Sequence, residues 1–184
     1  MKTVVACRIF EDELRACLRE RDDVKIHWVD AALHANLDRL EKDIRNRLEA
    51  LSVQGGARFL FFGAGCHPEL GKIADEYGFE AAPFRNCLEW LAGPEAREME
   101  RDRTMLMTPA WVRVWPQIMA VMGWDQVDAR IQLGRYDRIL VLDAGLHSLS
   151  DEEILNFFDL VQVPLMIEPV DVRDFCARIR EFIG

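Results

Sequence analysis

The sequence predicts an α/β fold, with a mainly parallel sheet flanked by helices in a Rossmann-like, three-layer arrangement. Short apolar segments alternate with segments that carry apolar residues at helical spacing, and this alternation continues along the whole chain. Turns rich in glycine or polar residues separate the segments. A chain of 184 residues has the length of one domain. We therefore expect a single α/β domain over residues 1–184.

Seven short apolar segments are predicted to be strands: residues 3–7, 24–29, 59–62, 79–83, 104–107, 138–142 and 163–167. The segments between and after them are predicted to be helices: residues 10–18, 36–51, 69–77, 86–93, 94–101, 109–122, 125–133, 151–160 and 170–183. The clearest helical pattern starts at Leu37, where leucine and isoleucine recur every three or four residues and charged residues cover the opposite face. Asn36, Asn86, Thr108 and Ser150 are predicted N-caps.

The net charge of −9 and the pI near 5.0 argue against a nucleic-acid or anionic-membrane surface. No apolar stretch is long enough for a signal peptide or a membrane span. We therefore expect a cytoplasmic protein with a small-molecule partner and no nucleic-acid or membrane partner. A homo-oligomer is a further expectation.

The chain has five cysteines: Cys7, Cys17, Cys66, Cys87 and Cys176. In a reducing compartment they are poor candidates for structural disulfides, and each is expected to be a buried apolar residue or a functional thiol. Cys17 lies late in a predicted helix, where packing is the expected role.

The segment Phe59–Glu69 carries the most chemical information. An apolar strand ends in Gly63-Ala64-Gly65, and Pro68 is expected to open the next helix. Cys66 would then lie at a helix N-terminus, which favours a thiolate. The turn through Gly63 and Gly65 could cradle a phosphate of a cofactor, although it matches no nucleotide-binding fingerprint.

Several chemically active side chains follow predicted strands: Cys7, His34, Cys66, Cys87, Thr108 and Asp143. The carboxyl ends of parallel strands meet at one edge, which is where ligands bind in open α/β sheets. The first hypothesis is therefore a transition-metal site, zinc or an iron–sulfur cluster, held by Cys7, Cys66 and Cys87, with His34 or His67 as the fourth ligand. The alternative is that these cysteines are buried small apolar residues.

Two other classes of function stay open. In a metal-free enzyme, Cys66 would be a nucleophile activated by its helix and by a histidine, although adjacent Cys66 and His67 seldom face each other. Asp143 would then orient a base or bind substrate, while its simpler role is to accept backbone N–H groups of the following turn. The other class is a non-catalytic binding protein for a small molecule.

The chain resembles an uncharacterised bacterial and archaeal family, catalogued as domain of unknown function 1638. The matching motifs, in order, are Val5-Ala6-Cys7, Leu33-His34, Gly65-Cys66, Asn86-Cys87-Leu88-Glu89-Trp90-Leu91-Ala92-Gly93, Leu106-Met107-Thr108-Pro109-Ala110-Trp111, Gly134-Arg135-Tyr136-Asp137-Arg138 and Leu142-Asp143-Ala144-Gly145. These motifs cover nearly the full length of the chain. The sequence departs from the family pattern at two places, with Ala110 where a glycine is usual and with His67-Pro68 after Cys66.

The resemblance assigns no activity. Because some family members are encoded near corrinoid-dependent methyltransferases, it implies methyl or one-carbon metabolism. A corrinoid or a corrinoid protein would then be a cofactor or partner, and His34 would be an axial ligand. The sequence lacks the Asp-x-His-x-x-Gly signature of cobalamin-binding domains.

Overall fold

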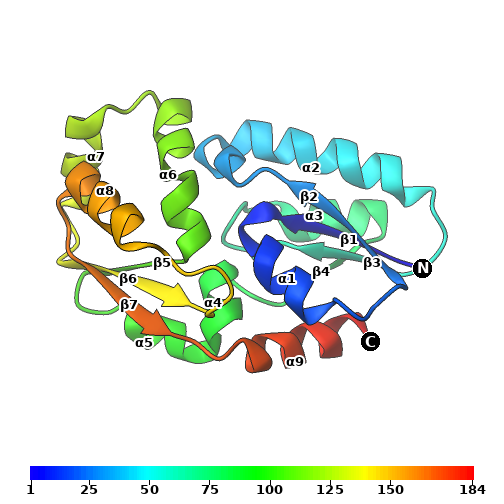
Figure 1. Ribbon diagram of the computed structural model, residues 1–184. Coiled ribbons are helices and arrows are strands. Elements are labelled where there is room, and N and C mark those ends of the chain that lie inside the picture. Colours follow the sequence, from blue (N-terminus) through cyan, green and yellow to red (C-terminus); the bar gives the residue numbers. More distant parts are fainter.

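The strands form two parallel sheets that lie side by side (Figure 1). The computed structural model describes residues 1–184. The first sheet has the strand order β2-β1-β3-β4 and the second has the order β5-β6-β7. Every pair of neighbouring strands is parallel. The prediction of an α/β fold with parallel strands flanked by helices is confirmed, and the strands divide between two sheets.

The strands are β1 (Lys2–Cys7), β2 (Val24–Val29), β3 (Arg58–Phe61), β4 (Glu80–Ala81), β5 (Thr104–Met107), β6 (Arg138–Asp143) and β7 (Leu165–Pro169). The α-helices are α1 (Glu11–Cys17), α2 (Leu37–Ser52), α3 (Leu70–Tyr77), α4 (Cys87–Ala92), α5 (Ala96–Met99), α6 (Pro109–Met122), α7 (Gln126–Leu133), α8 (Asp151–Val161) and α9 (Val172–Ile183). Three short 3-10 helices complete the structure: η1 (Arg8–Phe10), η2 (Ala31–Ala35) and η3 (Gly93–Glu95).

The carboxyl ends of both sheets point toward the junction between them (Figure 1). In the first sheet the strand order reverses between β1 and β3, so the chain leaves these two neighbouring strands in opposite directions. Such a reversal opens a crevice at the carboxyl ends of the strands. The topology therefore directs loops from both sheets into one region, which is where the candidate sites lie.

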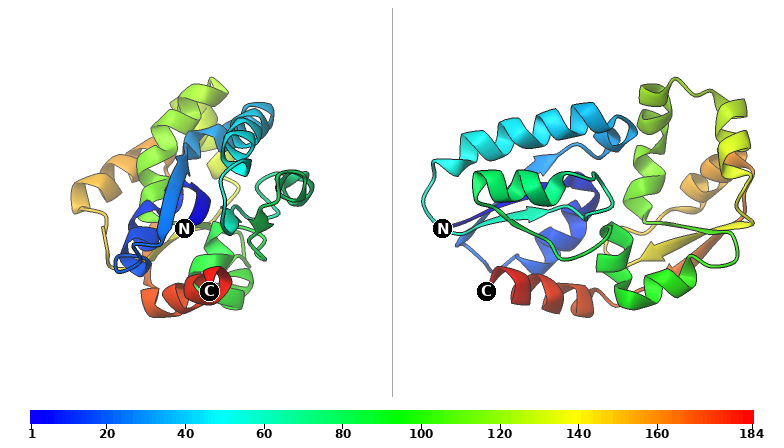
Figure 2. Two further views of the ribbon diagram at one scale, coloured as in Figure 1. Left: turned by 90° about the vertical axis from the view of Figure 1, so that its right-hand side faces the viewer. Right: turned by 180° about the vertical axis from the view of Figure 1, so that it is seen from behind.

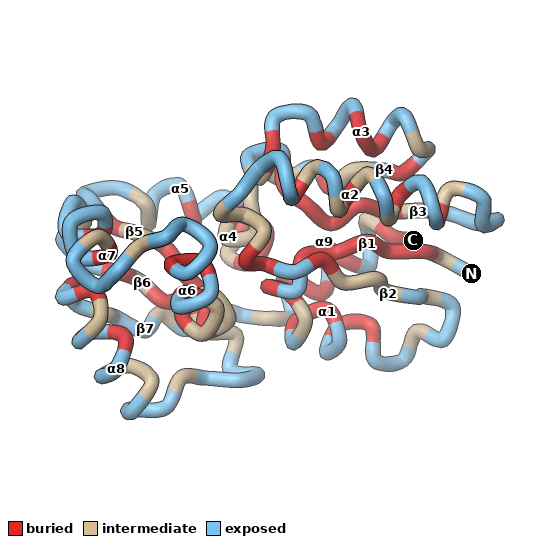
Figure 3. The backbone as a smooth tube through the Cα atoms, turned by 90° about the horizontal axis from the view of Figure 1, so that it is seen from above, coloured by how far each residue is buried: buried red, intermediate tan, exposed pale blue.

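Helices cover both faces of the first sheet (Figures 1 and 2). Helices α2 and α3 pack together on one face, and α1 packs with the C-terminal helix α9 on the other. The inner strands β1 and β3 are largely buried, whereas β7 and the outer faces of the helices are largely exposed (Figure 3). Helix α2 buries the predicted stripe through Leu40, Ile44, Leu48 and Leu51.

One hydrophobic core joins the two sheets. Its members include Val4 and Leu60 of the first sheet, Leu106 and Leu142 of the second, and Phe175 of α9. A second, smaller cluster lies between the second sheet and helices α6, α7 and α8. Because α9 follows the last strand of the second sheet and packs against the first, the end of the chain ties the two parts together.

The prediction that the cysteines form no disulfide is wrong. Cys17 at the end of α1 and Cys176 in α9 are bonded, with their Cα atoms 4.9 Å apart. They are separated by 159 residues, so no sequence pattern brings them together. The pairing follows from the packing of α9 on α1, which is a tertiary contact.

The predicted start of the third helix is also wrong. Pro68 does not open the helix, because α3 begins at Leu70 and Glu69 is its N-cap residue. The Glu69 backbone N–H donates to His67 Nδ1, which closes a separate turn ahead of the helix. Cys66 therefore lies in a turn four residues before α3, away from the N–H groups that would favour a thiolate.

The four predicted N-caps are confirmed. The side chains of Asn36, Asn86, Thr108 and Ser150 each accept a backbone N–H three residues later, as N-caps do. None of the helices combines the length and the apolar composition that crossing a membrane requires.

The shared core leads to a prediction about cooperativity. If residues 1–184 form a single domain, urea unfolding should give one transition, with coincident midpoints by far-UV circular dichroism and by tryptophan fluorescence. Two separate midpoints would show that the two sheets unfold independently.

Removing the disulfide should lower the stability of the fold. Because the bond closes a loop of more than 100 residues, the double variant Cys17→Ser, Cys176→Ser should lose about 2–4 kcal/mol of unfolding free energy. Urea unfolding with and without dithiothreitol measures this loss. The reductant should destabilise the wild type and leave the double variant unchanged; equal responses of the two proteins would contradict the prediction.

Candidate functional site

A cavity of about 390 Å³ lies between the two sheets, and we call it the thiol cavity. Cys66, Cys87 and His34 line it together with Asn86. Its apolar walls are Leu37 from α2, Leu88 from α4, Met105, Leu106 and Met107 from β5, and Trp111 and Trp115 from α6. With Gly65 the cavity has twelve lining residues, and nine are hydrophobic when the two cysteines are counted. The cavity therefore suits a small and largely apolar molecule.

A close backbone contact brings the two cysteines of this cavity together. The turn after β3 lies against the chain before α4, where the Ala64 and Gly65 N–H groups donate to the carbonyls of Phe84 and Arg85, at 2.9 and 2.6 Å. A Cβ atom on Gly63 would lie 2.3 Å from the Arg85 carbonyl oxygen. Glycine at this position therefore permits the approach that places Cys66 beside the start of α4.

Polar contacts of Glu89 hold the start of α4 in place. The Glu89 carboxylate is 7% exposed and accepts the Arg85 backbone N–H at 2.9 Å. Arg97 Nη2 pairs with its other oxygen at 2.6 Å. The side chain of Asn86 accepts the Glu89 N–H at 2.9 Å, as predicted for an N-cap.

An aromatic cluster around Trp90 packs against the same segment. Trp90 is 1% exposed and stacks on Phe61 of β3 and on Phe84, with ring centroids 4.6 and 4.5 Å apart. Edge-to-face contacts join it to Phe175 and Phe182 of α9. Helix α4 is therefore fixed against both β3 and α9.

Both thiols of the cavity are protonated at neutral pH. Burial raises the pKa of the Cys87 thiol to about 12, although Cys87 Sγ accepts the indole N–H of Trp111 at 3.4 Å. Burial also raises the pKa of Cys66, and a backbone hydrogen bond at Gly63 opposes this effect only in part. Reaction of either sulfur at neutral pH therefore requires a base.

The imidazole of His34 lines the same cavity. It stacks on Phe62 at a centroid distance of 5.9 Å and meets the edge of Trp111 at 5.5 Å. Its Nδ1 is 3.0 Å from the Ala31 carbonyl oxygen, so Nδ1 carries the proton and donates it, which leaves the Nε2 lone pair free. Burial lowers the pKa of His34, so the imidazole is neutral at pH 7.

The predicted metal centre is wrong. No group of three or more histidine, cysteine, aspartate or glutamate side chains is arranged to hold a metal ion. Cys7 ends β1 with an exposure of only 3% and does not line the thiol cavity. Cys66, Cys87 and His34 share the cavity without forming a ligand set. Without this ligand set, the predicted function in zinc or iron–sulfur binding is wrong as well. The predicted binding of a corrinoid and the predicted role in methyl transfer stay predictions, because no contact in the structure tests them.

Other predicted site residues lie elsewhere. His67 is 6% exposed and pairs through Nε2 with Glu41 of α2 at 3.3 Å, so it joins α2 to the turn before α3 and does not face Cys66. Asp143 lies outside the thiol cavity, and its Oδ1 accepts the Gly145 N–H at 2.8 Å, which is the simpler of its two expected roles.

The glycines of the turn have a different role from the expected phosphate cradle. Two N–H groups of this turn, those of Ala64 and Gly65, already donate to backbone carbonyls. Gly63 and Gly65 serve in the structure to bring two backbones together, and a phosphate would find these N–H groups engaged.

Sequence reasoning missed part of the site. Asn86 was expected only as an N-cap, yet it also lines the cavity, and its amide NH₂ makes no hydrogen bond within the protein. Trp111, for which the sequence predicted no role in a site, lines the cavity and donates its indole N–H to Cys87 Sγ. The available signal was the predicted N-cap position of Asn86 directly before Cys87, because an N-cap residue lies at the same helix start as the thiol.

Substitution of Gly63 tests the backbone contact. Gly63→Ala should destabilise the protein by about 2 kcal/mol or more, because its Cβ collides with a backbone carbonyl that side-chain rotation cannot move. Gly71→Ala is the matched control, since a Cβ at Gly71 in α3 meets open space and alanine favours the helix. Urea unfolding measures both; equal stabilities of the two variants would contradict the proposed contact.

Comparisons with known proteins place the sequence in a family and suggest no reaction. A solved structure described as glutamate racemase from Aquifex pyrophilus is similar at a TM-score of 0.45 and 16% identity, covering 100% of this chain and 84% of that chain. Similarity at this level assigns no activity. No curated protein matches the sequence. The family described as "Protein of unknown function (DUF1638)" matches residues 28–178 of the 184 residues. The expected resemblance is thus confirmed, and the chain belongs to the DUF1638 family.

Proposed function

We propose that the protein is a metal-free enzyme in which the Cys66 thiol reacts with a small, largely apolar carbonyl compound bound in the thiol cavity. One observation carries the proposal: a neutral imidazole with a free Nε2 and a buried thiol line the same apolar cavity. A protonated thiol and a neutral base are the two protonation states that proton transfer between them requires.

Each polar group of the cavity has a role in this reaction. His34 Nε2 takes the Cys66 proton, directly or through one water, because the two side chains make no hydrogen bond with each other in the structure. The NH₂ of Asn86 is placed to donate to the substrate oxygen. The apolar walls hold the remainder of the molecule and exclude water from the reacting atoms.

The step balances without a further reactant. The sulfur lone pair forms a bond to the carbonyl carbon as the proton leaves for His34, and the carbon–oxygen π pair becomes a lone pair on oxygen. The imidazolium then returns the proton to that oxygen. The result is a covalent adduct at Cys66, which is an intermediate of the proposed enzyme's reaction; reversal of the same steps frees the thiol again.

A non-catalytic binding protein is the second candidate. The observation that favours it is the raised pKa of both cavity thiols, because burial alone makes a thiol inert. The two candidates differ in the role of His34, which the enzyme needs as a base and the binding protein does not.

Alkylation with N-phenylmaleimide, an apolar electrophile of suitable size, tests the proposal. Its rate should saturate with reagent concentration, because the reagent binds before it reacts, and peptide mass spectrometry should locate the label at Cys66. His34→Gln should lower the saturating rate on the order of 10–100-fold by removing the base. His27→Gln is the matched control, since His27 lies on β2 outside the cavity.

The outcomes separate the candidates. Saturation with full dependence on His34 supports the enzyme. Saturation that is unchanged in His34→Gln leaves only binding, and unsaturated labelling that is equal in all variants would mean that the cavity does not recognise apolar compounds. In the wild type the rate should be level above pH 7, because His34 is already neutral there. In His34→Gln the rate should rise with pH, because burial holds the pKa of Cys66 above its usual range.

A further inference from the structure

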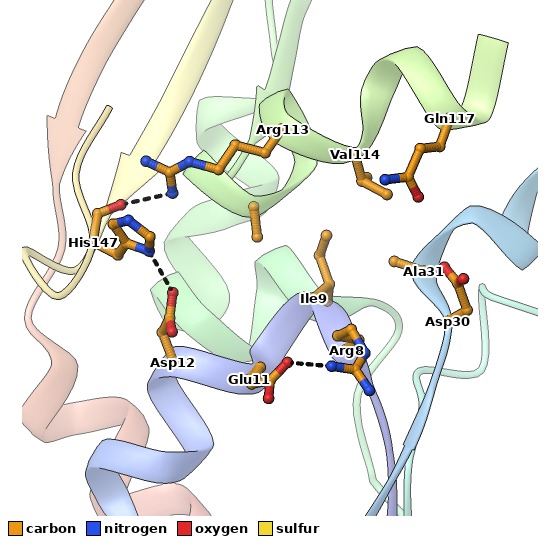
Figure 4. A pocket seen from close by; sticks show the side chains of 11 residues that line it. Arg8, Ile9, Glu11, Asp12, Asp30, Ala31, Arg113, Val114, Gln117 and His147 are labelled. Carbon is orange, nitrogen blue, oxygen red and sulfur yellow. Dashed lines mark hydrogen bonds and ion pairs between the residues drawn. The ribbon is translucent and has the colours of Figure 1, made fainter. Parts of the chain in front are cut away.

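A second cavity, lined by charged and polar groups, lies on the other side of α6 (Figure 4). It measures about 280 Å³ and shares no lining residue with the thiol cavity. Arg8 and Asp30 contribute from the carboxyl ends of β1 and β2, and Gln117 of α6 and His147 of the loop after β6 contribute from the other part of the molecule. We call it the polar cavity.

Contacts within the protein fix one wall of the polar cavity. Arg113 donates to both oxygens of Glu153 and to the carbonyls of His147 and Ser148, which uses four of its five guanidinium N–H groups. His147 Nδ1 lies 3.4 Å from a carboxylate oxygen of Asp12 (Figure 4). These contacts hold the loop after β6 against α1.

A small pocket, which we call the inner pocket, adjoins the polar cavity. Asp12, Ala110 and His147 line both spaces, and Glu13 and Asp143 line only the inner one. The inner pocket has a volume of about 10 Å³, which is room for one water-sized group. The three shared residues show that it adjoins the polar cavity, with Glu13 on its own side.

Glu13 is unusual among the lining residues of the inner pocket because it is a buried acidic residue. Glu13 is 7% exposed, and its side chain makes no hydrogen bond or ion pair with any other residue. Burial, with smaller effects from the negative charges of Asp12 and Asp143, raises the pKa of Glu13 to about 7. A buried carboxylate without a partner is costly, and a cation beside it would remove that cost.

No cation of the protein serves this purpose. Arg113 is engaged with Glu153, and Arg180 of α9, which packs on α1, donates to the Cys17 carbonyl. His147 pairs with Asp12. The charged groups that face Glu13 are thus Asp12 on its own helix, Asp143 on β6, and His147 on the following loop.

We propose that this pocket binds the ammonium group of a small primary amine, whose remainder lies in the polar cavity. An ammonium group has the size of the inner pocket, and its three N–H donors suit the carboxylates of Glu13 and Asp143. A quaternary ammonium group is too large for the inner pocket and has no N–H to donate. Arg8, which pairs only with Glu11, retains free guanidinium N–H groups for acceptors on the same molecule. This site is independent of the thiol chemistry.

Binding should depend on pH in a defined direction. The ammonium group requires the ionised form of Glu13, and a primary amine keeps its charge up to a pH of about 10. Below pH 7 one proton must leave Glu13 for each cation bound, so the affinity should rise up to about tenfold per pH unit as the pH increases toward 7 and then level off. Proton release on binding should follow the same curve.

Isothermal titration with methylammonium chloride tests this inference on the full chain between pH 5.5 and 8.5. Tetramethylammonium chloride at equal concentration is the matched ligand control, because it carries the charge without the N–H donors. Glu13→Gln should abolish methylammonium binding, whereas Glu20→Gln, which removes an exposed carboxylate just after α1, should leave it unchanged.

The expected result is binding of methylammonium by the wild type, with the stated rise in affinity, and none of tetramethylammonium. Equal binding of both cations, binding that persists in Glu13→Gln, absence of binding, or an affinity independent of pH would each overturn the proposal. If Glu13→Gln does not fold, the pH dependence and the comparison of the two cations in the wild type decide the question.

Discussion

The close contact between two backbones, the turn after β3 and the chain before α4, is the constraint on which the thiol cavity depends. Gly63 has no room for a side chain against the Arg85 carbonyl, and two backbone hydrogen bonds join the segments. The chain before α4 is held by a hydrogen bond from the Arg85 N–H to Glu89, and the start of α4 is held by stacking of Trp90 on Phe61. Without this approach, the two cavity cysteines would sit on separate loops.

The two sheets create sites that neither sheet has alone. Both turn their strand carboxyl ends toward the junction, and α6 lies between the two cavities found there. Trp111 and Trp115 face the apolar cavity, while Arg113 and Gln117 of the same helix line the polar one. An amphipathic helix thus separates an apolar space with thiols from a polar space with carboxylates.

Burial governs the protonation of the chemically active groups in both cavities. It raises the pKa values of Cys66, Cys87 and Glu13 and lowers that of His34, so each group favours its neutral form. Both proposals rest on the same physics, in which a bound molecule supplies the partner that the protein lacks.

The sequence by itself determined the order and type of the elements, because helical and strand periodicities and the capping side chains of Asn36, Asn86 and Thr108 are local signals. It also predicted a shared carboxyl edge for six side chains, of which His34, Cys66 and Cys87 line one cavity while Cys7 and Asp143 do not. Only the tertiary structure decided the division into two sheets, the bond between Cys17 and Cys176, and the absence of a metal ligand set. These depend on distances between segments far apart in the chain, and the spacing of residues in a sequence carries no such distances.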